Sequence, residues 1–198
     1  MKILAFTDLH GKREIVNGII RKTINENPDL LVCAGDLSDF GRQIERIAAN
    51  LNKLNKIILI IPGNHETDED ISKICKDNKN IINIHKGVYE KDSCLFFGYG
   101  GGGFSKEDPR FENISMKFKK MINKRKKVIF VTHAPIYNTK LDLLNGEHLG
   151  NKGTRRFIDD VQPELVICGH LHENEMITDY VKKTKIINPG YEGIIIKI

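Results

Sequence analysis

Residues 3–10 read Ile-Leu-Ala-Phe-Thr-Asp-Leu-His, a short apolar run that ends in two potential metal ligands, Asp8 and His10. The run is too short for a typical helix, and this favours a β-strand. The same arrangement, an apolar run followed by Asp, Asn or His, recurs four more times. The later blocks are Gly35-Asp36, Gly63-Asn64-His65, Thr132-His133 and Gly169-His170-Leu171-His172. Five of the seven histidines follow such runs, and this pattern predicts one shared site.

The chain has 198 residues, a length that suits a single domain over 1–198 with a sizeable core. Hydrophobic residues make up 40% and charged residues 29%, as in an ordinary globular protein. The first apolar run is too short for a signal peptide, and no run approaches the ~20 apolar residues of a membrane span. We therefore expect a cytoplasmic protein without a membrane partner. The four cysteines form no CxxC pair, so buried free thiols are expected.

Strand-like and helix-like patterns alternate along the first half of the chain. Strands are predicted at 3–6, 30–34, 56–61, 80–84, 94–98, 127–132, 164–168, 176–178, 185–188 and 193–198. Apolar stripes at helical spacing lie within 15–24, 44–51, 111–122 and 157–161. This alternation predicts parallel strands with crossover helices. The part after Gly169 is predicted to contain strands only, paired in antiparallel hairpins. An α/β fold with two sheets face to face and helices outside accommodates both parts.

A cluster of basic residues occupies 117–127 and includes Lys124. It contributes to a net charge of +5. Nucleic-acid binding is one interpretation of this cluster. A solvated helix face opposite the apolar stripe of Phe118 and Ile122 is the favoured one, because Phe118 is the one aromatic residue in 117–127 and it belongs to that stripe. Nucleic acid stays an alternative partner, and the sequence makes no prediction of oligomeric state.

The blocks of Asp, Asn and His follow the rule that functional groups gather at the carboxyl ends of strands. We expect five strand ends of one sheet to bring them together. The glycines at 35, 63 and 169 allow sharp turns and close backbone approach. Imidazole, carboxylate and amide groups together suit Mn, Fe or Zn. Two such ions ~3.5–4 Å apart need a bridging carboxylate and a bridging solvent molecule.

The ordered blocks DxH, GDxxD, GNHE, THAP and GHLH resemble the signature of the calcineurin-like metallophosphoesterase superfamily over residues 8–172. The resemblance implies a four-layer α/β/β/α sandwich with two mixed sheets. It also implies two divalent metal ions, with Mn as the first expectation and Fe, Zn or Ni as alternatives. The ligands that it implies are Asp8, His10 and His172 for the first ion, Asn64, His133 and His170 for the second, and Asp36 as the bridge.

The resemblance also implies roles at the substrate. His65 matches the histidine that faces the phosphate and the leaving group, and Asp39 matches the carboxylate that orients it. A metal-bridging hydroxide would attack phosphorus, and His65 would protonate the departing alkoxide. A purely structural histidine is the alternative for His65. Asn64 and His148 are expected to contact the substrate, and the alternative for His148 is an ordinary surface residue.

The chain departs from other branches of this superfamily in ways that favour a phosphodiesterase. Phe40 stands where the protein phosphatases carry an arginine, and the extra domain of the repair nucleases is missing. We expect hydrolysis of small or nucleotide-like phosphodiesters. The alternatives are a broad-specificity phosphomonoesterase, a nuclease and an inactive scaffold of the same fold. The glycine-rich stretch 98–103 lacks a following GK[ST] and is interpreted as a turn at the site rim, not as a P-loop.

Overall fold

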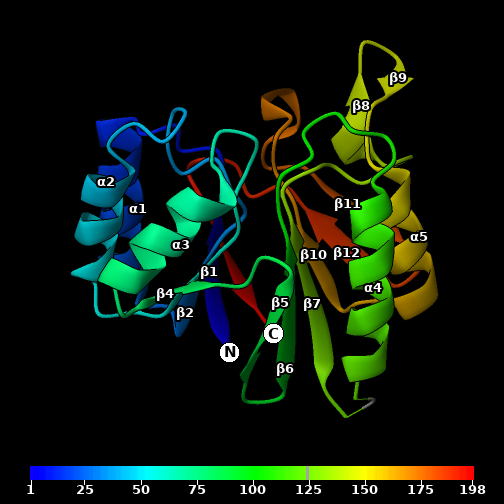
Figure 1. The fold of residues 1–198 in the computed structure, drawn as a ribbon, viewed down its shortest axis with the longest axis horizontal. Coiled ribbons are helices and arrows are strands. Elements are labelled where there is room, and N and C mark those ends of the chain that lie inside the picture. Colours follow the sequence, from blue (N-terminus) through cyan, green and yellow to red (C-terminus); the bar gives the residue numbers. More distant parts are fainter. Residues whose placement is uncertain (124) are drawn as a thin grey trace.

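Two β-sheets face each other at the centre of the molecule, and helices cover the outer face of each sheet (Figure 1). The computed structural model describes residues 1–123 and 125–198, so Lys124 of the basic cluster lies outside the described residues. The first sheet has the order β13 (Ile194–Lys197), β1 (Lys2–Phe6), β2 (Leu30–Cys33), β3 (Ile58–Ile60), β4 (Ile81–Asn83).

The second sheet is formed by the later strands, and a short hairpin stands apart from it. Its order is β11 (Thr178–Val181), β12 (Thr184–Ile187), β10 (Leu165–Ile167), β7 (Lys127–Thr132), β6 (Cys94–Tyr99), β5 (Gly87–Lys91). The hairpin consists of β8 (Leu143–Leu144) and β9 (Glu147–His148). The helices are α1 (Arg13–Glu26), α2 (Ile44–Asn52), α3 (Asp68–Asp77), α4 (Pro109–Met121) and α5 (Lys152–Val161), with short 3-10 turns η1 (Lys140–Asp142) and η2 (His172–Asn174).

Both faces of each central strand are buried, which explains why these strands read as continuous apolar runs. In β1, Leu4 and Phe6 pack toward the helices α1, α2 and α3, whereas Ile3 and Ala5 face the second sheet. The alternation follows from the two-residue period of a strand. On the far side, a cluster that includes Phe130 joins the second sheet to α4 and α5. The four-layer α/β/β/α architecture with two mixed sheets is therefore confirmed.

The parallel arrangement predicted for the first half is confirmed, because β1, β2, β3 and β4 pair in parallel. The prediction for the C-terminal part is wrong in two respects. Only β11 and β12 form an antiparallel hairpin there, since β12 pairs in parallel with β10. The last strand, β13, crosses to the first sheet and pairs antiparallel with β1, where Ile196 completes the core between the sheets. That part also contains the 3-10 turn η2.

Two smaller differences concern patterns on the surface of the fold. The sequence predicted a stripe on α1 that included Ile24, but the buried positions are Val16, Ile19 and Thr23, and Ile24 is exposed. The strand β5 was missed, because it lies at the edge of its sheet and is only half buried. All four cysteines are free thiols, and three of them are buried as expected, whereas Cys75 is half-buried.

The basic cluster is split between the end of α4 and the start of β7. Lys119 pairs with Asp160, and Lys126 pairs with Glu90. These ion pairs accord with a solvated surface. The cluster precedes β7, whereas His133 follows it, so the two lie at opposite ends of that strand. None of the helices in the described ranges combines the length and the apolar character that crossing a membrane requires.

Candidate metal centre

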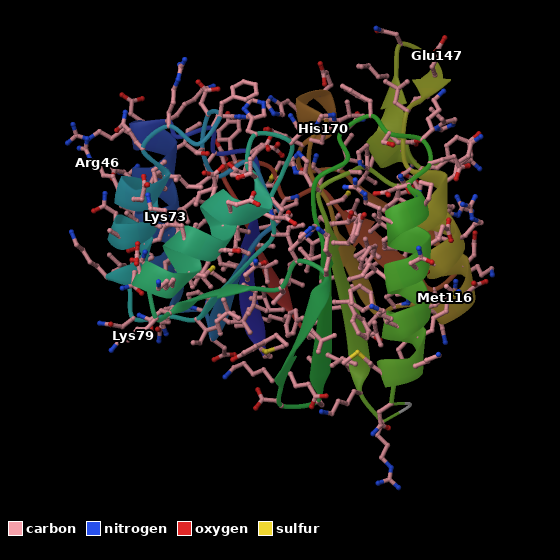
Figure 2. The ribbon with its side chains drawn as sticks, viewed as in Figure 1. Arg46, Lys73, Lys79, Met116, Glu147 and His170 are labelled. Carbon is pink, nitrogen blue, oxygen red and sulfur yellow. The ribbon has the colours of Figure 1, made fainter. Side chains whose placement is uncertain are left out.

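All five blocks lie at the edge where the carboxyl ends of the strands from both sheets meet. Figure 2 shows His170 at this edge, between the two halves of the molecule. The expectation that five strand ends of one sheet would converge is wrong: β1, β2 and β3 belong to the first sheet, and β7 and β10 to the second. Packing the sheets face to face places their parallel strand ends side by side. The site therefore forms only when both sheets are in place.

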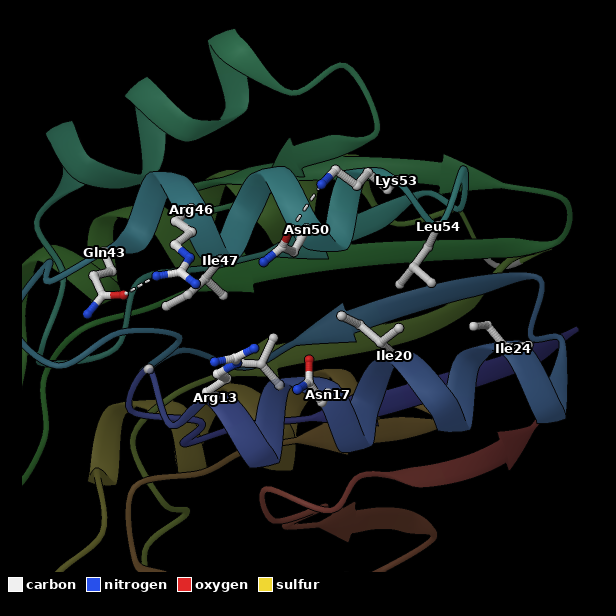
Figure 3. Close-up of a pocket in the computed structure, with 12 residues that line it drawn as sticks. Arg13, Asn17, Ile20, Ile24, Gln43, Arg46, Ile47, Asn50, Lys53 and Leu54 are labelled. Atoms are coloured by element: carbon white, nitrogen blue, oxygen red, sulfur yellow. Dashed lines mark hydrogen bonds between the residues drawn. The ribbon is translucent and has the colours of Figure 1, made fainter.

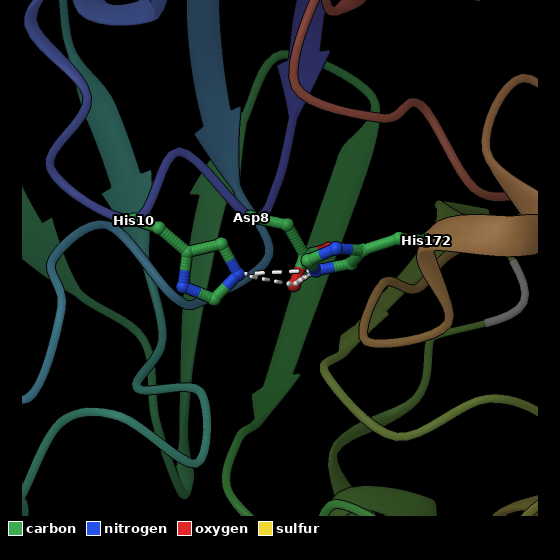
Figure 4. Close-up of side chains that lie close together, drawn as sticks. All are labelled: Asp8, His10 and His172. Carbon is green, nitrogen blue, oxygen red and sulfur yellow. Dashed lines mark hydrogen bonds and ion pairs between the residues drawn. The ribbon is translucent and has the colours of Figure 1, made fainter.

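The first group of donor atoms consists of one carboxylate and two imidazoles (Figure 4). Asp8 Oδ1 lies 3.6 Å from His172 Nε2 and 3.9 Å from His10 Nε2. The two imidazole nitrogens are 3.0 Å apart. Asp8 Oδ1 is buried and has no hydrogen-bond partner. Leaving a buried carboxylate oxygen unpaired is costly, and a cation held among these three atoms would remove that cost.

The second group of donor atoms surrounds Asp36. Its Oδ2 atom lies 3.5 Å from His133 Nε2 and 3.9 Å from His10 Nε2. His133 Nε2 is also 3.0 Å from Asn64 Oδ1. The other oxygen of Asp36 accepts a hydrogen bond of 3.0 Å from the backbone N–H of His65. Asp36 Oδ2 therefore lies between His10 of the first group and His133 of the second, as a carboxylate that bridges two ions would.

The orientation of His133 is fixed by the backbone. Its Nδ1 atom lies 2.9 Å from the carbonyl oxygen of Ala34, and a carbonyl can only accept, so Nδ1 carries a proton. Nε2 therefore faces the site, as in a histidine that binds a metal. The ring of His170 lies 5.2 Å from that of His133, and its buried Nε2 has no hydrogen-bond partner. This unpartnered nitrogen is a second donor that a cation would satisfy.

The charges in the site fit a cation. Burial raises the pKa of Asp36, but the hydrogen bond and charge of His133 outweigh burial and hold that pKa at about 2. Burial opposes protonation of His133, yet Asp36 outweighs burial and raises the pKa of His133 to about 9. Burial, together with the charge of His133, lowers the pKa of His170 to about 4. The carboxylates thus make this buried site favour positive charge, which a metal ion would supply.

Backbone strain is concentrated in the same loops. Asp8, His10, Asp36 and His170 all adopt positive φ, between 45° and 74°. Residues other than glycine rarely adopt this conformation, and it persists where the surrounding structure enforces it. Two glycines make the close packing possible. A Cβ on Gly63 would overlap Oδ1 of Asp36, and a Cβ on Gly169 would lie 2.7 Å from Oδ2 of Asp8. The close backbone approach predicted at Gly63 and Gly169 therefore occurs, and a larger residue at either position would collide with a carboxylate.

Glu66 holds the loops of the site together, a role that the sequence did not predict. Its buried carboxylate accepts hydrogen bonds from the backbone N–H groups of Asp36 at 3.0 Å, Ser38 at 2.8 Å and Gly63 at 3.0 Å. It also accepts one of 2.8 Å from the hydroxyl of Ser38. These donors come from the loop after β2 and the loop after β3. The only sequence signal for this role is its place directly after Asn64-His65.

Comparison with known proteins agrees with this geometry. The family model for calcineurin-like phosphoesterases matches residues 1–174. The chain belongs to the calcineurin-like phosphoesterase family. It is also 32% identical over 201 residues to the uncharacterized protein MJ1162 of Methanocaldococcus jannaschii, covering 96% of this chain and 88% of that one. The family implies a binuclear site for divalent ions and a phosphoesterase activity, and the two donor groups supply candidate ligands.

Solved structures share the fold at low identity. The protein TT1561 of Thermus thermophilus superposes with a TM-score of 0.79 at 16% identity, covering 96% of this chain and 88% of that one. A structure described as a novel archaeal phosphodiesterase has a TM-score of 0.57 at 19% identity, with 96% and 84% covered. At these identities the likeness is one of fold.

His65 and Asp39 lie beside Asp36. His65 Nε2 is 3.9 Å from Asp36 Oδ2, while its Nδ1 is 3.5 Å from Asp39 Oδ1. The latter distance is long for a hydrogen bond, and Asp39 also pairs with Arg42 at 3.3 Å. Donor geometry alone would also admit His65 as a metal ligand, because one of its ring nitrogens lies close to a ring nitrogen of His10 and a carboxylate oxygen of Asp36. The ring of Phe40 stacks on His65, with centroids 4.0 Å apart.

A cavity of about 270 Å³ opens over the donor atoms. Its floor is polar, and its wall is formed by Phe104, Leu144, Leu171 and the acidic Glu173. Among the described residues, neither lysine nor arginine lines it. Phe104 follows the glycine-rich stretch, of which Gly103 lies beside His170, whereas Gly100, Gly101 and Gly102 line a separate hollow. The edge of Phe104 contacts His170, with ring centroids 4.3 Å apart.

His148 does not line this cavity. It lies on the β8–β9 hairpin, and its Nδ1 donates a hydrogen bond of 2.7 Å to the fully buried Asp142. Asp142 also accepts from the backbone of Asn138, Thr139 and Gly150. The hairpin reaches the cavity through Leu144, whereas His148 belongs to the hydrogen-bond network that shapes the hairpin. Glu147, at the hairpin tip, points away from the body of the molecule (Figure 2).

A larger hollow, of about 420 Å³, lies elsewhere, in a groove between α1 and α2 (Figure 3). The apolar side chains of Ile20, Ile24 and Leu54 line one end, and Arg13 and Arg46 the other. The groove contains none of the predicted site residues.

Proposed function

We propose that this protein is a binuclear metal-dependent phosphodiesterase that hydrolyses small or nucleotide-like phosphodiesters. The observation that carries the proposal is the cavity over the donor atoms, with its polar floor, its apolar wall and no lysine or arginine among its described lining residues. A phosphomonoester brings a second negative charge, which phosphatase sites commonly meet with a cationic side chain. A diester brings one charge and a second organic group, which an apolar wall accommodates.

The proposed ligand sets use the residues of the two donor groups. Asp8, His10 and His172 would hold the first ion, Asn64, His133 and His170 the second, and Asp36 both. Mn is the first candidate, with Fe, Zn and Ni as alternatives, because this mixture of imidazole and oxygen donors suits all of them. When bound, such ions neutralise the phosphate oxygens and activate water. The ligands come from both sheets, and this supports treating 1–198 as one metallophosphoesterase domain.

His65 is proposed as the general acid. Hydrolysis forms a bond between the water oxygen and phosphorus and breaks the bond from phosphorus to the departing oxygen. The departing oxygen takes a proton from His65 Nε2, the nitrogen that faces Asp36 and the cavity. Asp39, beside Nδ1, would stabilise the protonated ring. An alkoxide leaves poorly without a proton, so this role matters most for a diester. Asn64, on the cavity floor, is proposed to contact the phosphate, and the position of His148 leaves it a role in shaping the hairpin.

The test is hydrolysis of bis-p-nitrophenyl phosphate beside p-nitrophenyl phosphate, using chelated enzyme that is reloaded with Mn²⁺. We expect metal-dependent turnover of the diester, lowered about 100-fold or more in His65→Ala. A general acid contributes more when the leaving group is a strong base, as an alkoxide is. His65→Ala should therefore slow the hydrolysis of alkyl esters more than that of nitrophenyl esters. Turnover of the monoester alone would replace the proposal with a phosphomonoesterase. Bound metal without turnover of either ester would favour an inactive scaffold.

A further inference from the structure

Two phenylalanine rings at the site are exposed, in contrast to every other phenylalanine of the chain. The sequence contains nine phenylalanines, and seven of them are buried in the core. The other two are Phe40, which is 71% exposed, and Phe104, which is 54% exposed. They come from different loops, after β2 and after β6, yet each contacts an imidazole of the site. A single exposed aromatic residue is common on protein surfaces, but these two rings both lie against imidazoles of one site, where a bound ligand would contact them.

The backbone at Phe40 adds a second observation. Phe40 has a φ of +50°, in the left-handed region that bulky residues avoid. Asn or Asp in this region can form local hydrogen bonds, but phenylalanine cannot. Nor does core burial offset the strain, since the ring is largely exposed. In this strained conformation the ring stacks on His65, with an angle of 26° between the two ring planes.

The two rings differ in the part of the substrate that they can meet. Phe40 lies against His65, the proposed donor of the proton to the departing oxygen. Phe104 lies against a different imidazole, that of His170, and lines the cavity with Leu144 and Leu171. Aromatic faces bind other planar rings by stacking and tolerate many ring chemistries.

We infer that Phe40 and Phe104 are specificity-determining residues that select phosphodiesters carrying planar aromatic groups, such as nucleobases or aryl rings. Phe40 contacts the ester group that leaves, and Phe104 contacts the ester group that stays on phosphorus. This inference rests on the proposed function, because a diester is the substrate that has two such groups. Stacking on one aromatic side chain corresponds to about 5- to 150-fold in kcat/KM for each ring.

The first experiment varies the group that stays. Thymidine 5′-p-nitrophenyl phosphate and methyl p-nitrophenyl phosphate release the same nitrophenolate, so their kcat/KM ratio reports the remaining group. We expect the wild type to prefer the thymidine ester about 10-fold or more, and Phe104→Leu to bring the ratio near one. Tyr180→Leu, which alters an exposed aromatic residue on β11, is the matched control and should keep the wild-type ratio.

The second experiment varies the group that leaves. The benzyl and methyl esters of adenosine 5′-phosphate release alcohols of similar acidity, and the release of adenosine 5′-phosphate is followed for both. We expect the wild type to prefer the benzyl ester, Phe40→Leu to lose that preference and Phe40→Tyr to keep it. If Phe40 only positions His65, Phe40→Leu will slow both esters equally and leave the ratio unchanged, and the inference for Phe40 is then overturned.

The outcomes separate this inference from the function on which it rests. Wild-type turnover of all these diesters without any preference for a ring overturns the inference and leaves the phosphodiesterase proposal standing. Absence of diester turnover in the metal-loaded wild type overturns both. A preference for nucleoside esters that benzyl and aryl groups do not share narrows the planar group to a nucleobase.

Discussion

Replacing Glu66 with alanine should destabilise the fold even though the residue is not a proposed ligand. The substitution leaves three buried backbone N–H groups, those of Asp36, Ser38 and Gly63, without their acceptor. Each buried donor that loses its partner costs about 1–3 kcal/mol. Burial raises the pKa of Glu66, which shows that burying its carboxylate is itself costly. This cost offsets part of the stability that its hydrogen bonds contribute. We expect Glu66→Ala to lower the free energy of unfolding by about 4 kcal/mol, a large part of the ~5–15 kcal/mol of a typical domain.

Glu66→Gln should cost about half as much, because one amide oxygen can still accept two of the hydrogen bonds. The assay is urea unfolding of the metal-free proteins near neutral pH, followed by circular dichroism. Glu69→Ala, at an exposed position three residues later, is the matched control and should change stability by less than about 0.5 kcal/mol. Calorimetry should also show Mn²⁺ affinity reduced about 10- to 100-fold in Glu66→Ala. A loss of stability below about 1 kcal/mol in Glu66→Ala would refute the argument from unpaired donors.

Two further predictions concern the loops around the site. Gly63→Ala should abolish tight metal binding in equilibrium dialysis, because the new Cβ overlaps Oδ1 of Asp36; retention of wild-type affinity would show that the loop can move aside. His85 accepts a hydrogen bond of 2.8 Å from the N–H of Gly100 through Nδ1, and burial lowers its pKa to about 4. The unfolded chain, with a histidine pKa of about 6.5, then binds more protons than the folded one, so stability is fully present above about pH 6.5 and falls toward about pH 4. His85→Gln, which keeps an acceptor for Gly100, should remove the contribution of His85 to this decline in thermal melts; an unchanged pH profile would contradict the assignment.

The ordered blocks of Asp, Asn and His were the basis for most of the predictions about the family and the candidate site. Parallel strands with crossover helices follow from short apolar runs that alternate with helical stripes, and the polar residues after each run mark the strand ends. Nothing local, however, separates β1, β2 and β3 from β7 and β10, because buried strands of both sheets have the same apolar character. The partition into two sheets, and hence the source of each ligand, depends on contacts distant in sequence.

Features of the site that depend on three-dimensional proximity were also missed. Glu66 is one polar residue among many until the loops after β2 and β3 come together around it. In the sequence, Phe40 differs from its neighbours only in standing where the protein phosphatases carry an arginine, and Phe104 only in following a glycine-rich stretch. Their exposure, and the φ of +50° at Phe40, are properties of the folded chain. For His148 the sequence suggested a contact with the substrate, because this polar residue lies in a long loop after His133. In the structure its ring is instead hydrogen-bonded to Asp142.

The antiparallel pairing of β13 with β1 affects how the chain must be made as well as how it is arranged. Lys2 pairs with Lys197, so one edge of β1 finds its partner only after nearly the whole chain is available. A ribosome synthesises β1 long before β13, and until β13 is made, β1 presents an open strand edge. Open apolar edges are templates for aggregation, and contacts of such long sequence separation form slowly. The nascent chain of this protein should therefore expose this edge of β1 until β13 has been synthesised.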